Sequence, residues 1–292
     1  MCTNSDDYFC LMKAGKYFLH NNKMVASGKA VLTADNRSFR FGDGLFETMR
    51  LTHGEIALSG YHFERLFSSL QAFYFDVPAH LTTAFFLEQI KKLAAKNNHQ
   101  KSARVRLIVF RSDGSLYDFA NNLPNYIIQT WPLKEAIRLN DKGLKSGLFT
   151  KARKACDDFS HIKNNNFLPY IMGALWARQN KLDEAVILNN YNRVADATIA
   201  NIFLVKDGKI ETPALSEGCI GGVMRRYLID CIKKEGLPFE ETAIAPDALA
   251  NANEFFVTNA VRGINWVGQY DRHNYNNQLA AYLYDKFLKG KL

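Results

Sequence analysis

The sequence predicts a mixed α/β fold with two domains, a smaller one in residues 1–130 and a larger one in residues 131–292. Segments with the apolar spacing of a helix alternate along the chain with segments that have the spacing of a strand. Residues 132–150 carry scattered charges and glycine or proline breaks, which is typical of a boundary between domains. A chain of 292 residues is long enough for two such domains.

The first domain shows clear turn signals and apolar periods. They predict a hairpin at 17–26, a strand after the turn at 42–44, helices at 61–73 and 82–96, and strands at 103–110 and 126–131. Arg65 lies near the apolar face of the first of these helices. Its guanidinium either snorkels to solvent or binds an anion such as a phosphate.

In the second domain, segments with helical spacing also alternate with segments that have the spacing of strands. The patterns predict helices at 167–180, after Gly222 and at 276–289, and strands at 185–188, 202–205, 209–212 and 254–257. In the first of these helices Leu168, Ile171, Met172 and Leu175 recur at helical spacing, which predicts an amphipathic helix.

Three features of the second domain could carry chemistry. Lys163 precedes three asparagines that disfavour regular structure, and a lysine desolvated there could form a Schiff base. Asp196 stands in an otherwise uncharged run, so it is either the acid of a surface turn or the partner of a protonated pyridine nitrogen. Gly222 opens a helix whose first N–H groups, with Val223 and Met224, favour a phosphate. Thr258 and Asn259 add donors at a strand end.

The composition narrows the function classes. The net charge of +8 indicates a basic surface or attraction to anionic ligands, while the absence of dense Lys/Arg runs argues against nucleic acid. Five cysteines without a C-x-x-C pair argue against a disulfide framework or a zinc site and favour the cytoplasm. No apolar run approaches the length of a membrane span, no signal peptide is recognisable, and no metal site is predicted.

Taken together, these motifs resemble the class IV aminotransferase family, the fold-type IV enzymes of pyridoxal 5'-phosphate (PLP). The resemblance rests on four segments: Phe41-Gly42-Asp43-Gly44-Leu45-Phe46-Glu47-Thr48, His62-Phe63-Glu64-Arg65-Leu66, Asp196 to Asn201-Ile202-Phe203, and Gly222-Val223-Met224-Arg225. Asp196 departs from the family, which usually has glutamate. The resemblance implies a barrel-like sheet in the larger C-terminal domain, an active site between the domains and a homodimer.

The same resemblance implies roles for single residues. Lys163 would be the catalytic residue and would hold PLP, together with Arg65, Asp196, Gly222, Val223, Met224, Thr258 and Asn259. Arg262 and Arg111 would bind a small anionic amino substrate.

Three activities of the family compete. Leu168 stands where branched-chain aminotransferases carry tyrosine, and no histidine follows Arg111 as it does in D-amino acid aminotransferases. Thr258-Asn259-Ala260-Val261-Arg262-Gly263 is most similar to 4-amino-4-deoxychorismate lyase, an enzyme of folate biosynthesis. The lyase is therefore the first expectation. The alternatives are a branched-chain or D-amino acid aminotransferase using 2-oxoglutarate, and a PLP-binding protein without catalytic activity.

Overall fold

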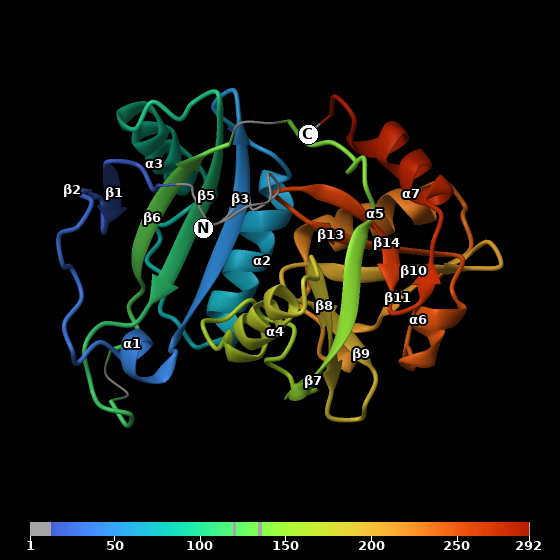
Figure 1. The fold of residues 1–292 in the computed structure, drawn as a ribbon. Helices are drawn as coiled ribbons and strands as arrows, with labels where there is room; N and C mark the ends of the chain where they lie inside the picture. The colour runs from blue at the N-terminus through green and yellow to red at the C-terminus, as the bar shows by residue number, and fades with distance from the viewer. Residues whose placement is uncertain (1–12, 119–120, 134–135, 292) are drawn as a thin grey trace. The chain divides into compact units, whose positions relative to one another are not determined.

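A computed structural model of the chain describes residues 13–118, 121–133 and 136–291. The chain divides into two compact units, residues 1–136 and 137–292. The sequence predicts this boundary at 130/131. Each unit contains one sheet (Figure 1).

The N-terminal unit is an antiparallel sheet against which helices α2 and α3 pack. The sheet has the order β2-β1-β6-β5-β3-β4. Its strands are β1 (Tyr17–His20), β2 (Lys23–Ala26), β3 (Gly44–Thr52), β4 (Glu55–Ile56), β5 (Ser102–Phe110) and β6 (Asn125–Pro132). The helices are α1 (Arg37–Phe41), α2 (Ser59–Ala72) and α3 (Thr83–Lys96). Each helix and strand predicted for this domain is present.

The core of this unit lies between the sheet and helices α2 and α3. Phe63 and Leu66 of α2 pack in one cluster with Phe86 of α3 and Val105 and Leu107 of β5. Along β5, every second residue is buried up to Val109, as the alternation of apolar and basic residues predicts. The opposite face of the sheet therefore carries the arginines of β5.

The C-terminal unit has a mixed nine-stranded sheet in the order β12-β11-β10-β13-β14-β7-β8-β9, with β15 beside β14. The strands are β7 (Leu144–Lys154), β8 (Glu184–Asn189), β9 (Val194–Ala197), β10 (Asn201–Lys206), β11 (Lys209–Pro213), β12 (Phe239–Thr242), β13 (Glu254–Asn259), β14 (Gly263–Tyr270) and β15 (His273–Asn274). The sheet curls, because β9 at one end packs against β10 and β11. The predicted barrel-like sheet is confirmed.

Helices cover this curled sheet. They are α4 (Leu168–Gln179), α5 (Val223–Lys234), α6 (Asp247–Asn251) and α7 (Gln278–Leu283), with short turns η1 (Leu215–Glu217) and η2 (Tyr284–Leu288). Helix α4 packs against β7 and β8, and α5 packs against β13. Among the described residues, no helix has the length and apolar character needed to cross a membrane.

Helix α4 buries a different face from the one its leucine spacing suggests. The four residues Leu168, Ile171, Met172 and Leu175 are between 44% and 65% exposed. The buried residues are Tyr170, Gly173 and Ala177. Small side chains let the helix approach the sheet closely: a Cβ on Gly173 would lie 3.2 Å from Thr198 Cγ2. The sequence alone could not choose between two faces that are both apolar.

Candidate active site

Asp196 is the buried acid of the C-terminal unit. It lies on β9, 1% exposed, and three donors reach its carboxylate. Asn201 Nδ2 donates to Oδ1 at 2.8 Å, while the backbone N–H of Ile220 (2.8 Å) and the hydroxyl of Tyr170 (2.7 Å) donate to Oδ2. Asp196 is therefore not the acid of a surface turn, which was the alternative interpretation of its sequence.

Lys154 lies one hydrogen bond beyond Tyr170. Its ammonium donates to Tyr170 Oη at 2.7 Å and to the carbonyl of Ser160 at 2.9 Å, and the residue is 8% exposed. Lys154 ends β7, whose register against β8 shifts between Phe149 and Lys154. This shift and the buried Ser160 contact hold the side chain inside the unit.

Burial and charge have opposite effects on the pKa values of Asp196 and Lys154, the two charged residues that Tyr170 connects. Burial raises the pKa of Asp196, and the charge of Lys154 is the largest opposing influence. Burial lowers the pKa of Lys154, and the Asp196 carboxylate raises it again. Burial and Asp196 hold the pKa of Tyr170 well above its ordinary value, so the tyrosine keeps its proton and donates it to Asp196.

A cradle for a phosphate lies beside Asp196. Asn201 pairs with Thr258 across strands β10 and β13, and its amide also donates to the carbonyl of Ile220 at 2.7 Å. A Cβ on Gly222 would lie 1.9 Å from Asn201 Oδ1, so a larger residue there would displace the Asn201 amide from its hydrogen bonds to Asp196 and Ile220. The three residues Asn201, Gly222 and Thr258 are thus brought together.

Two observations point to an anion at this cradle. Helix α5 begins after Gly222, which supplies no capping side chain, so the N–H groups of Val223 and Met224 have no partner within the helix. The hydroxyl of Thr258 is buried and has no hydrogen-bond partner among the described residues. A phosphate accepts from donors of both kinds.

Lys163 lies on an irregular segment just before α4. Its neighbour Ile162 is 3% exposed and anchors the segment, while Lys163 itself is half-buried. The Lys163 ammonium lies 5.2 Å from the centroid of the Phe167 ring, and that ring stacks on Tyr170 with centroids 4.4 Å apart. The backbone N–H of Gly221 donates to the carbonyl of His161 at 2.9 Å. These contacts connect the lysine segment to Asp196 on one side and to the glycine pair on the other.

Asn259 shapes the turn that carries Arg262. Its Oδ1 accepts from the backbone N–H groups of Val261 at 3.0 Å and Arg262 at 2.9 Å. Its side-chain amide nitrogen remains the group that could donate to a ligand. Burial raises the pKa of the Glu184 carboxyl, hydrogen bonds from Thr198 oppose that rise, and Arg262 is close enough for its charge to oppose it as well.

Arg65 belongs to the N-terminal unit, where it pairs with Glu47. Its Nε and Nη2 donate to the two carboxylate oxygens at 2.8 and 2.6 Å, and His62 Nδ1 lies 2.7 Å from Oε2. Arg65 therefore does not simply snorkel to solvent. Its role toward a phosphate stays a prediction.

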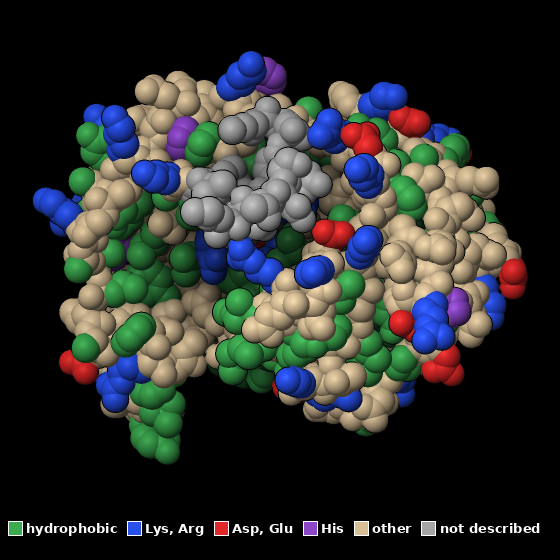
Figure 2. All heavy atoms as spheres, viewed as in Figure 1, with side chains coloured by type: hydrophobic (Ala, Val, Ile, Leu, Met, Phe, Trp, Pro, Cys, Tyr) green, Lys and Arg blue, Asp and Glu red, His purple; other side chains and the backbone are tan. Residues whose placement is uncertain are grey.

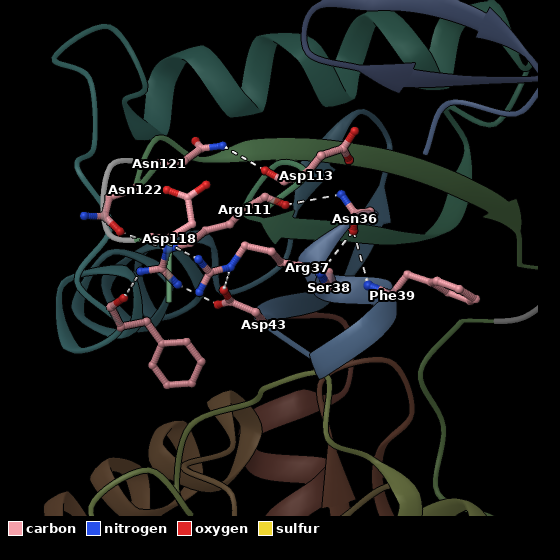
Figure 3. Close-up of polar contacts among 11 residues, drawn as sticks. Asn36, Arg37, Ser38, Phe39, Asp43, Arg111, Asp113, Asp118, Asn121 and Asn122 are labelled. Atoms are coloured by element: carbon pink, nitrogen blue, oxygen red, sulfur yellow. Dashed lines mark hydrogen bonds and ion pairs between the residues drawn. The ribbon is translucent and has the colours of Figure 1, made fainter. Parts of the chain in front are cut away.

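Arg111 is held on several sides within the same unit (Figure 3). Its Nη1 donates to Asp43 at 2.5 Å, its Nε donates to Asn122 at 3.2 Å, and its Nη2 donates to the carbonyl of Phe73. Asp43 also accepts from Arg37 Nε at 2.8 Å. These contacts give Arg111 a structural role, and its predicted role toward a substrate finds no support in them.

Three residues around Asp196, namely Lys154, Tyr170 and Asn201, were not predicted from the sequence as site residues. In the N-terminal unit, Arg106 was not predicted to have a special role either. Arg106 lies over the Phe46 ring at 4.0 Å, and its buried Nε has no hydrogen-bond partner among the described residues. Burial, with the charge of Arg104, lowers the pKa of Arg106 to about 10. Tyr170 lies in the first turn of α4, seven residues after Lys163, and this closeness in sequence was a signal for including it.

The residues of the C-terminal unit fit PLP. The unpartnered Thr258 hydroxyl and the start of α5 suit its phosphate. A carboxylate offers about four acceptor positions, and Asp196 uses three of them, which leaves one for the ring N–H. Among the described residues, no group of histidine, cysteine and acidic side chains could hold a metal ion.

Comparisons with known proteins agree with this chemistry. The family model of amino-transferase class IV matches residues 44–270. An aminodeoxychorismate lyase of Bacillus subtilis is 28% identical over 264 residues, 88% of each chain. A D-alanine aminotransferase of Listeria monocytogenes is 27% identical over 246 residues, 82% of each chain. A branched-chain aminotransferase of the archaeon Thermoproteus uzoniensis, solved with norvaline, matches with a TM-score of 0.83 and 23% identity, over 95% of this chain and 96% of the other.

The family match covers well over half of the chain and includes every motif segment except the first residues of the Phe41–Thr48 stretch. The likeness to the solved aminotransferase extends to both the antiparallel N-terminal sheet and the curled C-terminal sheet. The chain therefore belongs to the amino-transferase class IV family and is a PLP-dependent enzyme of the aminotransferase or lyase type.

Proposed function

We propose that the protein is a 4-amino-4-deoxychorismate lyase, which converts aminodeoxychorismate to 4-aminobenzoate and pyruvate. The observation that carries this proposal is the turn after β13. Asn259 fixes that turn through two backbone N–H groups, so Arg262 stands near the strand end that carries Thr258. A substrate with two carboxylates needs such a cation, and an arginine can bind a carboxylate with two hydrogen bonds.

Two further features support this proposal. One argues against a branched-chain aminotransferase, and the other favours an anionic substrate. Position 168, five residues after Lys163, is a leucine and therefore offers no hydroxyl to a ligand. Arg106 is a partly buried cation whose Nε has no protein acceptor among the described residues. A carboxylate of the substrate is a suitable partner for such a group.

In this proposal each residue of the site has a separate role in binding the cofactor or moving a proton. PLP, when bound, supplies the aldehyde that the substrate amine joins and the ring that takes up electrons from the substrate carbon. Lys163 holds the cofactor and then accepts the substrate proton. Asp196 accepts the ring N–H, while Gly222, Val223, Met224, Thr258, Asn259 and Arg65 bind the phosphate. Elimination of pyruvate then leaves the aromatic ring of 4-aminobenzoate.

The test is a comparison of substrates with the PLP-loaded protein. Aminodeoxychorismate should yield 4-aminobenzoate and pyruvate in equal amounts. L-leucine, L-isoleucine and D-alanine, each with 2-oxoglutarate, should give little or no glutamate. Fast formation of glutamate from a branched-chain substrate, without 4-aminobenzoate, would overturn the lyase and establish the aminotransferase. A protein that takes up PLP but converts none of these substrates would favour the non-catalytic PLP-binding role.

We also propose that the enzyme is a homodimer. Hydrophobic side chains gather on the surface over α4 (Figure 2), where Leu168, Ile171, Met172 and Leu175 are exposed. A pocket of about 320 Å³ adjoins them, lined by Phe149 and Trp176 among others. An apolar patch of this kind often marks a protein interface. Sedimentation should show a dimer that Ile171→Glu weakens, and a monomer with full activity would count against the proposal.

We place the protein in the cytoplasm. Cys156, Cys219 and Cys231 are free thiols in the part of the chain that the structure describes. Free thiols are typical of proteins kept in a reducing compartment. Fractionation of cells that express the tagged protein tests this placement.

A further inference from the structure

We propose that Lys154 and Tyr170 are positioning residues that act through Asp196, holding it as a buried carboxylate and leaving its Oδ1 to accept the ring N–H of the cofactor. The inference rests on the proposed function to the extent that PLP binds beside Lys163. It does not depend on whether the enzyme is a lyase or an aminotransferase.

The first support is the direction of the hydrogen bonds. The Lys154 ammonium can only donate, so Tyr170 Oη accepts from it at 2.7 Å. The tyrosine proton is then directed to Asp196 Oδ2, again at 2.7 Å. Each group has one consistent role, and the charge of Lys154 reaches the carboxylate through a single oxygen atom.

The second support is the burial of the carboxylate. Asp196 is 1% exposed, and among the described residues no lysine or arginine forms a direct ion pair with it. A carboxylate without water or a cation tends to take up a proton. Lys154 supplies the compensating charge from one residue away, and Tyr170 transmits it. Without either one, Asp196 would become a neutral acid that stabilises a protonated ring poorly.

The third support is the distribution of donors between the two oxygens. Oδ2 accepts from Tyr170 and from the backbone of Ile220, whereas Oδ1 accepts, among the residues that the structure describes, only from Asn201. Since each oxygen offers about two acceptor positions, the open position is on Oδ1. Tyr170 thereby decides which oxygen is left for the cofactor.

Lys154 has a second contact, and an experiment must separate its effect from the effect of Lys154 on Asp196. Its bond to the carbonyl of Ser160 anchors the segment that leads to Lys163. Lys154→Met therefore disturbs both Asp196 and that segment. Tyr170→Phe removes a single oxygen atom and leaves the Ser160 contact in place, so it is the cleaner variant.

The experiment measures binding instead of turnover. The apoprotein is titrated with PLP and with 1-deazapyridoxal 5'-phosphate, in which carbon replaces the ring nitrogen. The ratio of the two dissociation constants reports the contact with the ring nitrogen alone. We expect the unchanged protein to prefer PLP and Asp196→Asn to lose most of that preference. Tyr170→Phe and Lys154→Met should each reduce it by about tenfold, the effect expected for one charge-assisted hydrogen bond.

Tyr275→Phe is the matched control. Tyr275 is also a buried tyrosine of the C-terminal unit, but its hydroxyl donates to the carbonyl of Leu249. Its removal should leave the preference unchanged. An unaltered preference in Tyr170→Phe would overturn the inference, even if Lys154→Met fails to fold. If the unchanged protein binds neither compound, the proposed function fails at an earlier step, and the two failures are thereby distinguished.

Discussion

Arg65 and Glu47 form a bidentate ion pair inside the N-terminal unit, with Nε to Oε1 at 2.8 Å and Nη2 to Oε2 at 2.6 Å. His62 contacts the same carboxylate, and the glutamate is 2% exposed. The pair fixes the orientation of a guanidinium that the family resemblance assigns to a phosphate. A preorganised cation loses less entropy when it binds an anion.

Arg65→Ala should weaken the binding of PLP more than it slows turnover at saturating PLP. The variant loses a charge-assisted contact, so the start of α5 would remain as the main anchor for the phosphate. Titration of the apoprotein gives the affinity, and circular dichroism checks the fold. An unchanged dissociation constant would confine Arg65 to its pairing with Glu47.

Glu47 should make the N-terminal unit sensitive to acid. Burial alone would raise the pKa of Glu47, but Arg65 and His62 lower it from 4.5 to about 2. Because the folded-state pKa is depressed, the stabilisation is full above the unfolded value and is lost as the pH falls from about 4.5 to about 2. Glu47→Gln should therefore destabilise the protein at pH 7 by on the order of 3 kcal/mol.

Urea unfolding between neutral and acidic pH checks this expectation. The difference between Glu47→Gln and the unchanged protein should shrink below pH ~4.5. Glu55→Gln is the control, because Glu55 is exposed and its ion pair with Lys91 lies at the surface. A difference for Glu47→Gln that stays constant over the whole pH range would contradict the assigned charge state.

Lys163→Ala should abolish activity and the covalent attachment of PLP. The reason is the loss of the amine that both holds the cofactor and moves the proton. Borohydride reduction followed by peptide mass analysis should find the cofactor on Lys163 in the unchanged protein. Lys206→Ala, which removes an exposed lysine of β10, serves as the control. Attachment to another lysine, with turnover retained in Lys163→Ala, would show that the assignment is wrong.

Thr258→Val should separate stability from cofactor binding. The Thr258 hydroxyl is buried without a hydrogen-bond partner among the described residues, so its removal should cost the apoprotein little. The affinity for PLP should fall about tenfold with the loss of one donor to the phosphate. Ser146→Ala removes another such buried hydroxyl, on β7, and should leave affinity unchanged. A destabilised Thr258→Val apoprotein with normal affinity would refute the phosphate contact.

The sequence identifies the helices and strands well where the apolar period is simple, as in β5, and where a turn has its own signal, as at Gly42. It also singles out Asp196, which the structure shows to be buried, because the neighbours of this acid are uncharged. The role of Lys163 stays a prediction. The sequence does not identify Lys154, since a lysine that ends a strand resembles any solvated lysine until the shift between β7 and β8 turns it inward. For α4, two apolar faces compete, and only close packing at Gly173 decides between them.

The pairing of β7 with β14 places Leu144 opposite Val267, so segments from the two ends of the C-terminal unit lie side by side within one sheet. Contacts of such long sequence separation form late and slowly during folding. Lys163 follows β7 along the chain and Thr258 precedes β14, so this pair joins the segment of the proposed Schiff-base lysine to that of the proposed phosphate site. We therefore expect PLP to bind only after folding is complete. Bound PLP should then lower the rate of unfolding and leave the rate of folding unchanged.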